Sequence, residues 1–258
     1  MAEAHESRDK SVRARAFGDV CNHFTPVFHH FFLENFHTPA DWFMRRLAFT
    51  RSSAASSIVG YILGLGDRHS QNILIDKATA EVIHIDLGVA FDQGKALKTP
   101  EVVPFRLTRD VVDGMGVNGC DGVFRRCREE TVRVLRARHQ ALETILEVFV
   151  HDPLCNWALS PTAVLRLQRP DDAEASPAEA TAVVVVGIAA VTSQQGSTPE
   201  ASRGNKEAER ALQRLKAKLQ GLEYGDTLSV EGQVSQLIVE AEDPSRLCQM
   251  FPGWAPWL

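Results

Sequence analysis

An apolar helical pattern that ends in glycines and runs into a short polar loop constrains this chain more than any other feature. Within 41–65, apolar residues recur at i, i+4, i+7, i+8 and i+11, namely Ala54, Ile58, Tyr61, Ile62 and Leu65. This spacing places them on one face, so it predicts a buried helix. Gly64 and Gly66 are expected to end that helix. The polar residues that follow are therefore mounted on a rigid support, which suits a functional site.

Two short β-branched segments follow the loop, "ILI" at 73–75 and "EVIHID" at 81–86. The polar stretch "DKATA" separates them, so together they predict a small antiparallel hairpin. Elsewhere the apolar periodicity predicts helices within 16–35, 121–150, 206–222 and 230–241. Pro244 is expected to stop the last of these. The predicted fold is mostly α with a small β-hairpin.

Composition limits the classes of partner. The chain is 44% apolar and 24% charged with a net charge of −5, which is ordinary for a soluble globular protein. Its densest basic stretch, 8–15, is too short and mixed to favour a nucleic-acid site. The five cysteines lie far apart, which is typical of a reducing compartment. The longest apolar run, 181–191, falls short of the ~20 residues of a membrane helix. We expect no nucleic-acid site and no membrane contact.

Three oxygen-bearing side chains have the spacing that phosphoryl transfer requires. That reaction needs a carboxylate to orient the attacking hydroxyl, and oxygen ligands for magnesium on the phosphates. In protein kinases an Asp-x-x-x-x-Asn loop precedes a hairpin and a second acid in Asp-Phe-Gly. Here Asp67 and Asn72 have that offset, and the hairpin ends in Asp86-Leu87-Gly88. A polar turn with capping acids is the alternative, but the order of the elements favours kinase chemistry.

The stretches "GDRHSQN" and "HIDLGVAF" resemble the phosphatidylinositol 3-kinase-related protein kinase family, in which the histidine follows the acid. The tail is similar to that family's C-terminal FATC module. The resemblance implies the C-terminal lobe of a PI3/PI4-kinase-like α+β fold, with the small lobe missing. The implied parts are a kinase lobe at 1–169 with catalytic loop 64–72 and activation segment 86–108, a linker at 170–205, a regulatory helix at 206–226 and the tail at 227–258.

The same resemblance assigns the catalytic and metal-binding roles. Asp67 is expected to orient the substrate hydroxyl and accept its proton. His69 is expected to assist, either as a base or by stabilising charge on the transferring phosphoryl group. Asn72 and Asp86 are expected to hold the metal ions. The implied cofactors are ATP and Mg²⁺ or Mn²⁺.

Three further residues complete the predicted site. Leu74 and Ile85 flank the metal-binding residues in the hairpin, and the resemblance implies that they form the floor under the adenine. The role of Arg68 stays open between a structural ion pair and catalysis.

The resemblance also implies the reaction and its setting. The expected activity is transfer of phosphate from ATP to serine or threonine followed by glutamine, in the DNA-damage response. The expected location is the nucleus and also the cytoplasm. Besides its protein substrates, the expected partners are the N-terminal kinase lobe and the helical solenoid of a parent protein, which is expected to be a homodimer.

A complete kinase has a glycine-rich cover over the phosphates and a strand lysine that reaches them. Gly18 is the only glycine before Gly60, and Lys10 is the only lysine before Lys77. The expected small lobe is therefore missing from this sequence. Because part of the phosphate cradle is lost with it, we expect the chain alone to have negligible kinase activity.

Two other interpretations stay open. A phosphoinositide lipid kinase shares the permuted loop, but residues 89–104 carry only Lys95 and Lys98 as basic groups for a lipid headgroup. A non-catalytic interaction module would use tail aromatics such as Trp254 and Trp257 to dock a partner. Packing of those tryptophans on the lobe is the competing use.

Overall fold

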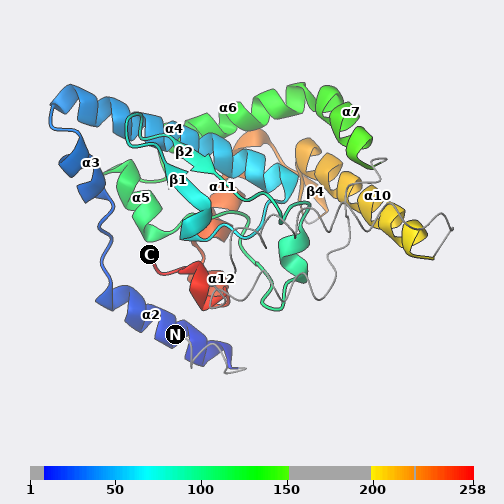
Figure 1. Cartoon of the computed structure of the whole chain (residues 1–258), viewed down its shortest axis with the longest axis horizontal. Coiled ribbons are helices and arrows are strands. Elements are labelled where there is room, and N and C mark those ends of the chain that lie inside the picture. Colours follow the sequence, from blue (N-terminus) through cyan, green and yellow to red (C-terminus); the bar gives the residue numbers. More distant parts are fainter. Residues whose placement is uncertain (1–8, 151–198, 224) are drawn as a thin grey trace, which may run out of the picture. The chain divides into compact units, whose positions relative to one another are not determined.

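The computed structural model describes residues 9–150, 199–223 and 225–258 (Figure 1). The chain forms two compact units, the first from residues 1–138 and 217–258 and the second from 139–216. Helices dominate the described residues, which also contain two small antiparallel sheets. The predicted mostly α fold with a hairpin is therefore confirmed, and the second sheet is an addition to it.

The long helix α4 (Pro39–Leu63) organises the first unit, and α2 (Lys10–His23) and α3 (His29–Asn35) precede it. Thr38 caps its start by accepting the N–H of Asp41, and Pro39 occupies the first turn. Gly64 ends the helix in the left-handed region, at φ 63°, as glycine at this position commonly does. The predicted buried face is confirmed for Ala54, Ile58, Tyr61 and Ile62, which are all buried. Leu65, predicted as part of that face, lies beyond the helix end and is only partly buried.

The hairpin pairs β1 (Ile73–Ile75) with β2 (Val82–His84), as predicted, and Leu74 lies opposite Ile83. The turn is held by Asp76, whose Oδ1 accepts the N–H groups of residues 78 and 79. Strand β2 packs beside α4 (Figure 1), and the N–H of Val82 donates to Ser52 Oγ at 3.0 Å. The opposite face of the hairpin is open, because Leu74 and Ile83 are 47% and 48% exposed.

The predicted helix at 121–150 is two helices, α6 (Val123–Ala137) and α7 (His139–Val150), with Arg138 between them. Helix α6 packs against α4, as does α5 (Arg109–Met115). Helix α10 (Pro199–Gln220) is longer than the helix predicted at 206–222. Residues 199–205, predicted as linker, form its start, whereas 170–198 and the apolar run 181–191 lie outside the described residues. Within the second unit, Lys216 Nζ contacts Glu143 at 3.3 Å.

The second sheet, β3 (Leu222–Glu223) paired with β4 (Asp226–Thr227), lies between α10 and the helices of the tail. Helix α11 (Val230–Glu242) follows, and Ser229 caps it. Pro244 does not simply stop this helix, because it is also the first residue of α12 (Pro244–Leu247). Proline is tolerated there because the first helical turn needs no N–H donor. Among the described residues, no helix combines the length and apolar character needed to cross a membrane.

The end of the tail packs against α2 within the first unit. Trp254, in the 3-10 turn Pro252–Trp254, is 4% exposed. It belongs to a buried cluster that also contains Phe17, Leu247, Cys248 and Met250. Arg106 donates to the main-chain oxygen of Ala255 at 3.1 Å, and its guanidinium lies 4.5 Å from the Trp254 ring centroid. This packing favours a structural role for Trp254 over docking of a partner.

Candidate active site

The predicted catalytic loop, 64–72, joins α4 to β1 and is bound to the segment after the hairpin. The N–H of Gly66 donates to the oxygen of Val89 at 2.9 Å. The N–H of Asp92 donates to the oxygen of Gly64, also at 2.9 Å. A Cβ on Gly64 would lie 2.3 Å from the nitrogen of Asp92, so the close approach requires glycine. The loop and the segment that starts at Asp86 therefore form one structural piece.

Asp67 adopts a left-handed conformation at φ 58°, and Asp86 does so at φ 52°. Such conformations are uncommon outside glycine, and they persist where surrounding contacts enforce them. Asn72 Nδ2 donates to the main-chain oxygen of Asp67 at 2.9 Å. The structure therefore brings Asp67 and Asn72 together, as the kinase interpretation requires.

His69 lies beside the Asp67 carboxylate, with 3.9 Å between Nε2 and Oδ1. Its other ring nitrogen, Nδ1, accepts the N–H of Gln71 at 3.2 Å. An Nδ1 that accepts a hydrogen bond places the proton of the neutral imidazole on Nε2. The nitrogen nearest Asp67 is then the donor.

Burial raises the pKa of Asp67 above its usual value, against the opposing effect of His69 and Arg68. The neighbouring carboxylate of Asp86 also raises it. A carboxyl whose pKa lies nearer to neutrality is a stronger proton acceptor. The electrostatics of the loop thus suit Asp67 for taking a proton from a hydroxyl.

Arg68 has a structural role. Its side chain is buried and donates to three main-chain oxygens: Nε to Gly66 at 2.8 Å, Nη1 to Ile85 at 2.7 Å, and Nη2 to Asp86. These acceptors are main-chain carbonyls, so Arg68 holds the loop through hydrogen bonds to the main chain and not through the ion pair considered from the sequence. Arg68 thereby joins the catalytic loop to the residue pair that ends the hairpin.

Asn72 and Asp86 present the oxygen atoms that a divalent metal prefers. The amide nitrogen of Asn72 is directed to Asp67, so its Oδ1 is the atom suited to a metal. Ile85, next to Asp86, donates its N–H to the Asn72 main-chain oxygen at 3.1 Å and so links the two. The described residues contain no group of three or more His, Cys, Asp or Glu side chains that could together hold a metal ion. An amide and a carboxylate nevertheless fit Mg²⁺, which also takes phosphate and water oxygens.

The predicted adenine floor is an exposed apolar surface. Leu74 and Ile83 lie opposite each other in the hairpin, and Ile85, two residues further on, is 39% exposed. Residues two apart along a strand share a face. The structure therefore places Leu74 on the open face and extends that face to Ile85, next to Asp86.

Glu101 was not predicted as a site residue. Its Oε1 accepts the N–H of Asp67 at 2.8 Å, and burial raises the pKa of its carboxyl to about 7. No motif marks this glutamate, because the contact spans 34 residues of sequence. The only sign of this contact in the sequence is indirect: Gly66 and Gly94 carry no side chain, which leaves room for the Glu101 carboxylate.

A second unpredicted contact joins α10 to the segment after the hairpin. Lys218 Nζ lies 3.0 Å from Asp92 Oδ1 and donates to the main-chain oxygen of Tyr61 at 2.8 Å. Burial alone would raise the pKa of Asp92, but Lys218 and Lys95 outweigh that effect and lower it. The end of α10 is thereby tied directly to the loop region.

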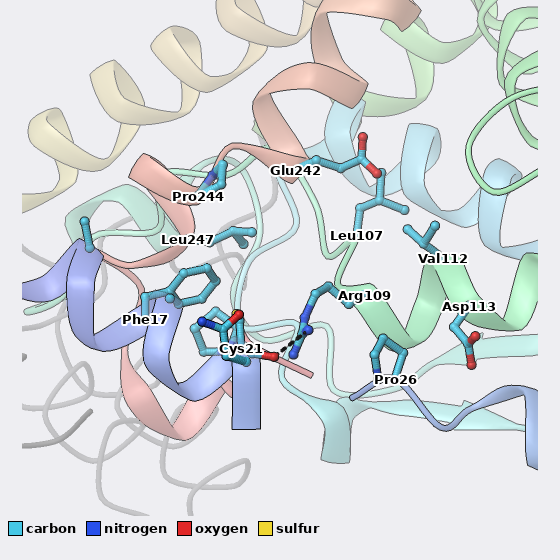
Figure 2. A pocket seen from close by; sticks show the side chains of 14 residues that line it. Phe17, Cys21, Pro26, Leu107, Arg109, Val112, Asp113, Glu242, Pro244 and Leu247 are labelled. Carbon is cyan, nitrogen blue, oxygen red and sulfur yellow. Dashed lines mark hydrogen bonds between the residues drawn. The ribbon is translucent and has the colours of Figure 1, made fainter. Parts of the chain in front are cut away.

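A cavity of about 670 Å³ lies away from these residues, between α2, α5 and the tail (Figure 2). Its walls are mostly apolar and include Phe17, Leu107 and Leu247. Arg109 reaches into it but donates to the main-chain oxygen of Cys21 at 2.9 Å (Figure 2). Arg109 also donates to the main-chain oxygen of Trp257 at 2.8 Å. None of its lining residues is a predicted site residue, so the catalytic loop and the hairpin remain the candidate site.

Two family profiles match the chain. The profile described as phosphatidylinositol 3- and 4-kinase matches residues 2–159. The profile of the FATC domain matches residues 227–258.

The similar curated proteins include "Serine/threonine-protein kinase ATM" of Arabidopsis thaliana, 56% identical over 98% of this chain and 6% of that protein. "Serine-protein kinase ATM" of Sus scrofa is 51% identical over 98% of this chain and 8% of its own length. "Serine/threonine-protein kinase tel1" of Schizosaccharomyces pombe is 46% identical over 97% of this chain and 9% of its own length. The chain thus spans 6–9% of the length of these three relatives.

Solved structures are similar over the whole chain. The FAT and kinase domain of CtTel1 matches with a TM-score of 0.82 and 40% identity, covering 100% of this chain and 15% of that one. The Tel1 kinase butterfly symmetric dimer matches with a TM-score of 0.79 and 40% identity, covering 99% of this chain and 9% of that one. The fold, including its tail, is thus that of known kinases.

Proposed function

This chain belongs to the phosphatidylinositol 3- and 4-kinase family, and we propose that it supplies the C-terminal part of a serine/threonine protein kinase active site. The observation that carries the proposal is the grouping of three residues: Asn72 donates to the main chain of Asp67, and His69 Nε2 lies 3.9 Å from the Asp67 carboxylate. Arg68 joins this group to the main chain of Asp86. The relatives at 46–56% identity are named as protein kinases, which supports protein as the substrate class.

In the proposed reaction, the oxygen of a substrate serine or threonine attacks the γ-phosphorus of ATP. The hydroxyl proton passes to the Asp67 carboxylate, and the bond from the γ-phosphorus to the bridging oxygen breaks to release ADP. The raised pKa of Asp67 favours this transfer. His69, with its Nε2 proton facing the same site, stabilises negative charge on the transferring group.

Asn72 and Asp86 are proposed to hold Mg²⁺ or Mn²⁺, with Asn72 Oδ1 and the Asp86 carboxylate as ligands. The bound ion would neutralise charge on the phosphates of ATP. Leu74 and Ile85 are proposed to pack on the adenine, because they form an exposed apolar face beside Asp86.

The proposed targets are proteins with serine or threonine followed by glutamine, in the DNA-damage response of the nucleus and also of the cytoplasm. The proposed partners are the N-terminal kinase lobe and helical solenoid of a longer protein. A homodimer is proposed because one similar solved structure is titled a complete CtTel1 dimer. A lipid substrate is disfavoured, since one of the two lysines in 89–104, Lys95, already lies 3.2 Å from Asp92.

A segment graft tests the proposal. The corresponding C-terminal segment of Schizosaccharomyces pombe tel1, to which this chain is 46% identical, is replaced by this chain. With ATP and Mg²⁺, the graft should phosphorylate a Ser-Gln peptide. Asp67→Asn should lower kcat by roughly 10²- to 10⁴-fold, because it removes the proton acceptor.

The matched control is Asp121→Asn, which changes an exposed acid paired with Arg125 and should leave kcat unchanged. The ungrafted chain should show negligible transfer. Full activity of the Asp67→Asn graft would refute the assignment of Asp67. Phosphorylation of phosphoinositide vesicles without phosphorylation of the peptide would refute the proposed protein kinase activity and favour a lipid kinase.

A further inference from the structure

Glu101 lies in the predicted activation segment, yet its carboxylate reaches into the catalytic loop. Oε1 accepts the N–H of Asp67 at 2.8 Å. Oε2 lies against two bare α-carbons, because a Cβ on Gly66 or Gly94 would come within 2.6 or 2.4 Å of it. The carboxylate therefore fits between two residues only because both lack a side chain.

The main chain of Asp67 is held on both sides. Its N–H is bound by Glu101, and its carbonyl accepts Asn72 Nδ2 at 2.9 Å. A left-handed conformation costs an L-residue about 1–2 kcal/mol, so these contacts must enforce the φ of 58°. Because the side chain leaves from the same α-carbon, the orientation of this backbone sets the direction of the Asp67 carboxylate.

The position of Glu101 is itself fixed by the fold of the activation segment. Its N–H donates to the main-chain oxygen of Gly94 at 3.1 Å, which closes the stretch 94–101. The same stretch contains Leu97, which is buried. Glu101 can therefore reach Asp67 only when this stretch is folded against the catalytic loop.

We propose that Glu101 is a positioning residue that holds Asp67 in the orientation needed for phosphoryl transfer. It acts through the Asp67 backbone, so the geometry of the catalytic loop depends on the folding of the activation segment. The catalytic consequence rests on the proposed function, whereas the contact itself can be measured without activity.

The first test is amide hydrogen exchange, resolved by residue, on the 258-residue chain. Glu101→Ala should increase exchange at the Asp67 amide by at least roughly tenfold, because the amide loses its acceptor. Glu101→Gln keeps an oxygen acceptor and should retain protection. Glu34→Ala, at an exposed glutamate of α3, is the matched control and should change nothing in the loop. Unchanged protection in Glu101→Ala would overturn the contact.

The second test measures kinetics in the grafted kinase. Glu101→Ala should lower kcat by roughly tenfold or more, since a small misplacement of a catalytic group is costly. The KM for ATP should stay within about twofold, and Glu101→Gln should keep most of the activity. Wild-type kcat in Glu101→Ala, or equal losses in both variants, would overturn the positioning role. An inactive wild-type graft would instead refute the proposed function, while hydrogen exchange would still decide the contact.

Discussion

At the residue scale, the two aspartates proposed for the site are oriented by main-chain contacts. Asp67 and Asp86 both have positive φ, at 58° and 52°. The N–H of Asp67 donates to Glu101, and its carbonyl accepts a hydrogen bond from Asn72. The carbonyl of Asp86 accepts a hydrogen bond from Arg68. A substitution that crowds these contacts should therefore disturb the site even when no catalytic side chain changes.

Gly66→Ala is expected to destabilise the chain by about 1–3 kcal/mol, because the new methyl group would lie 2.6 Å from Glu101 Oε2 and 3.0 Å from Val89. The measurement is the free energy of unfolding in denaturant. Gly18→Ala is the matched control: it lies in α2 with no heavy atom within 4 Å of the added Cβ. That variant should gain about 0.5–1 kcal/mol from helix propensity. Equal effects of the two substitutions would contradict the crowding argument.

At the element scale, α10 is tied to the segment after the hairpin through a buried ion pair. Lys218 and Asp92 are 11% and 9% exposed. Removing Lys218 leaves the buried Asp92 carboxylate with weaker compensation, from Lys95 at 3.2 Å, whose side chain is 66% exposed. Lys218→Met should therefore lower the free energy of unfolding by about 1–3 kcal/mol. In a double-mutant cycle with Asp92→Asn, the coupling should exceed about 1 kcal/mol, and strict additivity would count against the pair.

The same pair predicts a pH dependence. The pKa of Asp92 in the folded chain is lowered from 3.8, so the folded state favours the ionised carboxylate. Its contribution to stability is complete above the unfolded value and is lost as the pH falls through the folded one. The stability gap between wild type and Asp92→Asn should therefore be constant near neutrality and close below about pH 4.

Local patterns predicted the elements better than their boundaries. The hairpin and the end of α4 followed from β-branched runs and a glycine at the helix end. The break at Arg138 was missed because the apolar periodicity continues across it. The pair β3–β4 was missed because each strand has only two residues, which is too short to show an alternating pattern. In the site, the spacing of Asp67, Asn72 and Asp86 was visible in the sequence. Glu101 was not, because only folding brings it to Asp67.

At the scale of the whole molecule, the last residues of the chain complete the core of the first unit. Trp254 is buried with Phe17 of α2, and Arg106, near the end of the predicted activation segment, donates to the main chain of the tail. The helical spacing in the tail was predicted, but its position against α2 was not. That contact joins residues more than two hundred positions apart, beyond the range of any periodicity.

Trp254→Ala should lower the free energy of unfolding by about 3–5 kcal/mol, because it opens a cavity in the buried cluster. Val239→Ala on α11 is the control, since that side chain is 69% exposed and should change stability by less than about 0.5 kcal/mol. Unfolding curves of both variants measure the difference. If Trp254→Ala unfolded like wild type and lost only the binding of a partner, the tail would be an interaction module.

Arg68 has a consequence for how the site can change over time. All three of its hydrogen-bond acceptors are main-chain oxygens, of Gly66, Ile85 and Asp86. Every residue type carries such an oxygen, so Arg68 places no demand on the chemistry of the side chain at position 85. Substitutions at position 85 can therefore change the apolar surface proposed to bind the nucleotide without moving Asp67 or Asp86. The hydrogen bonds of Arg68 do not depend on which side chain position 85 carries. The proposed nucleotide specificity can therefore evolve separately from the positions of the two aspartates.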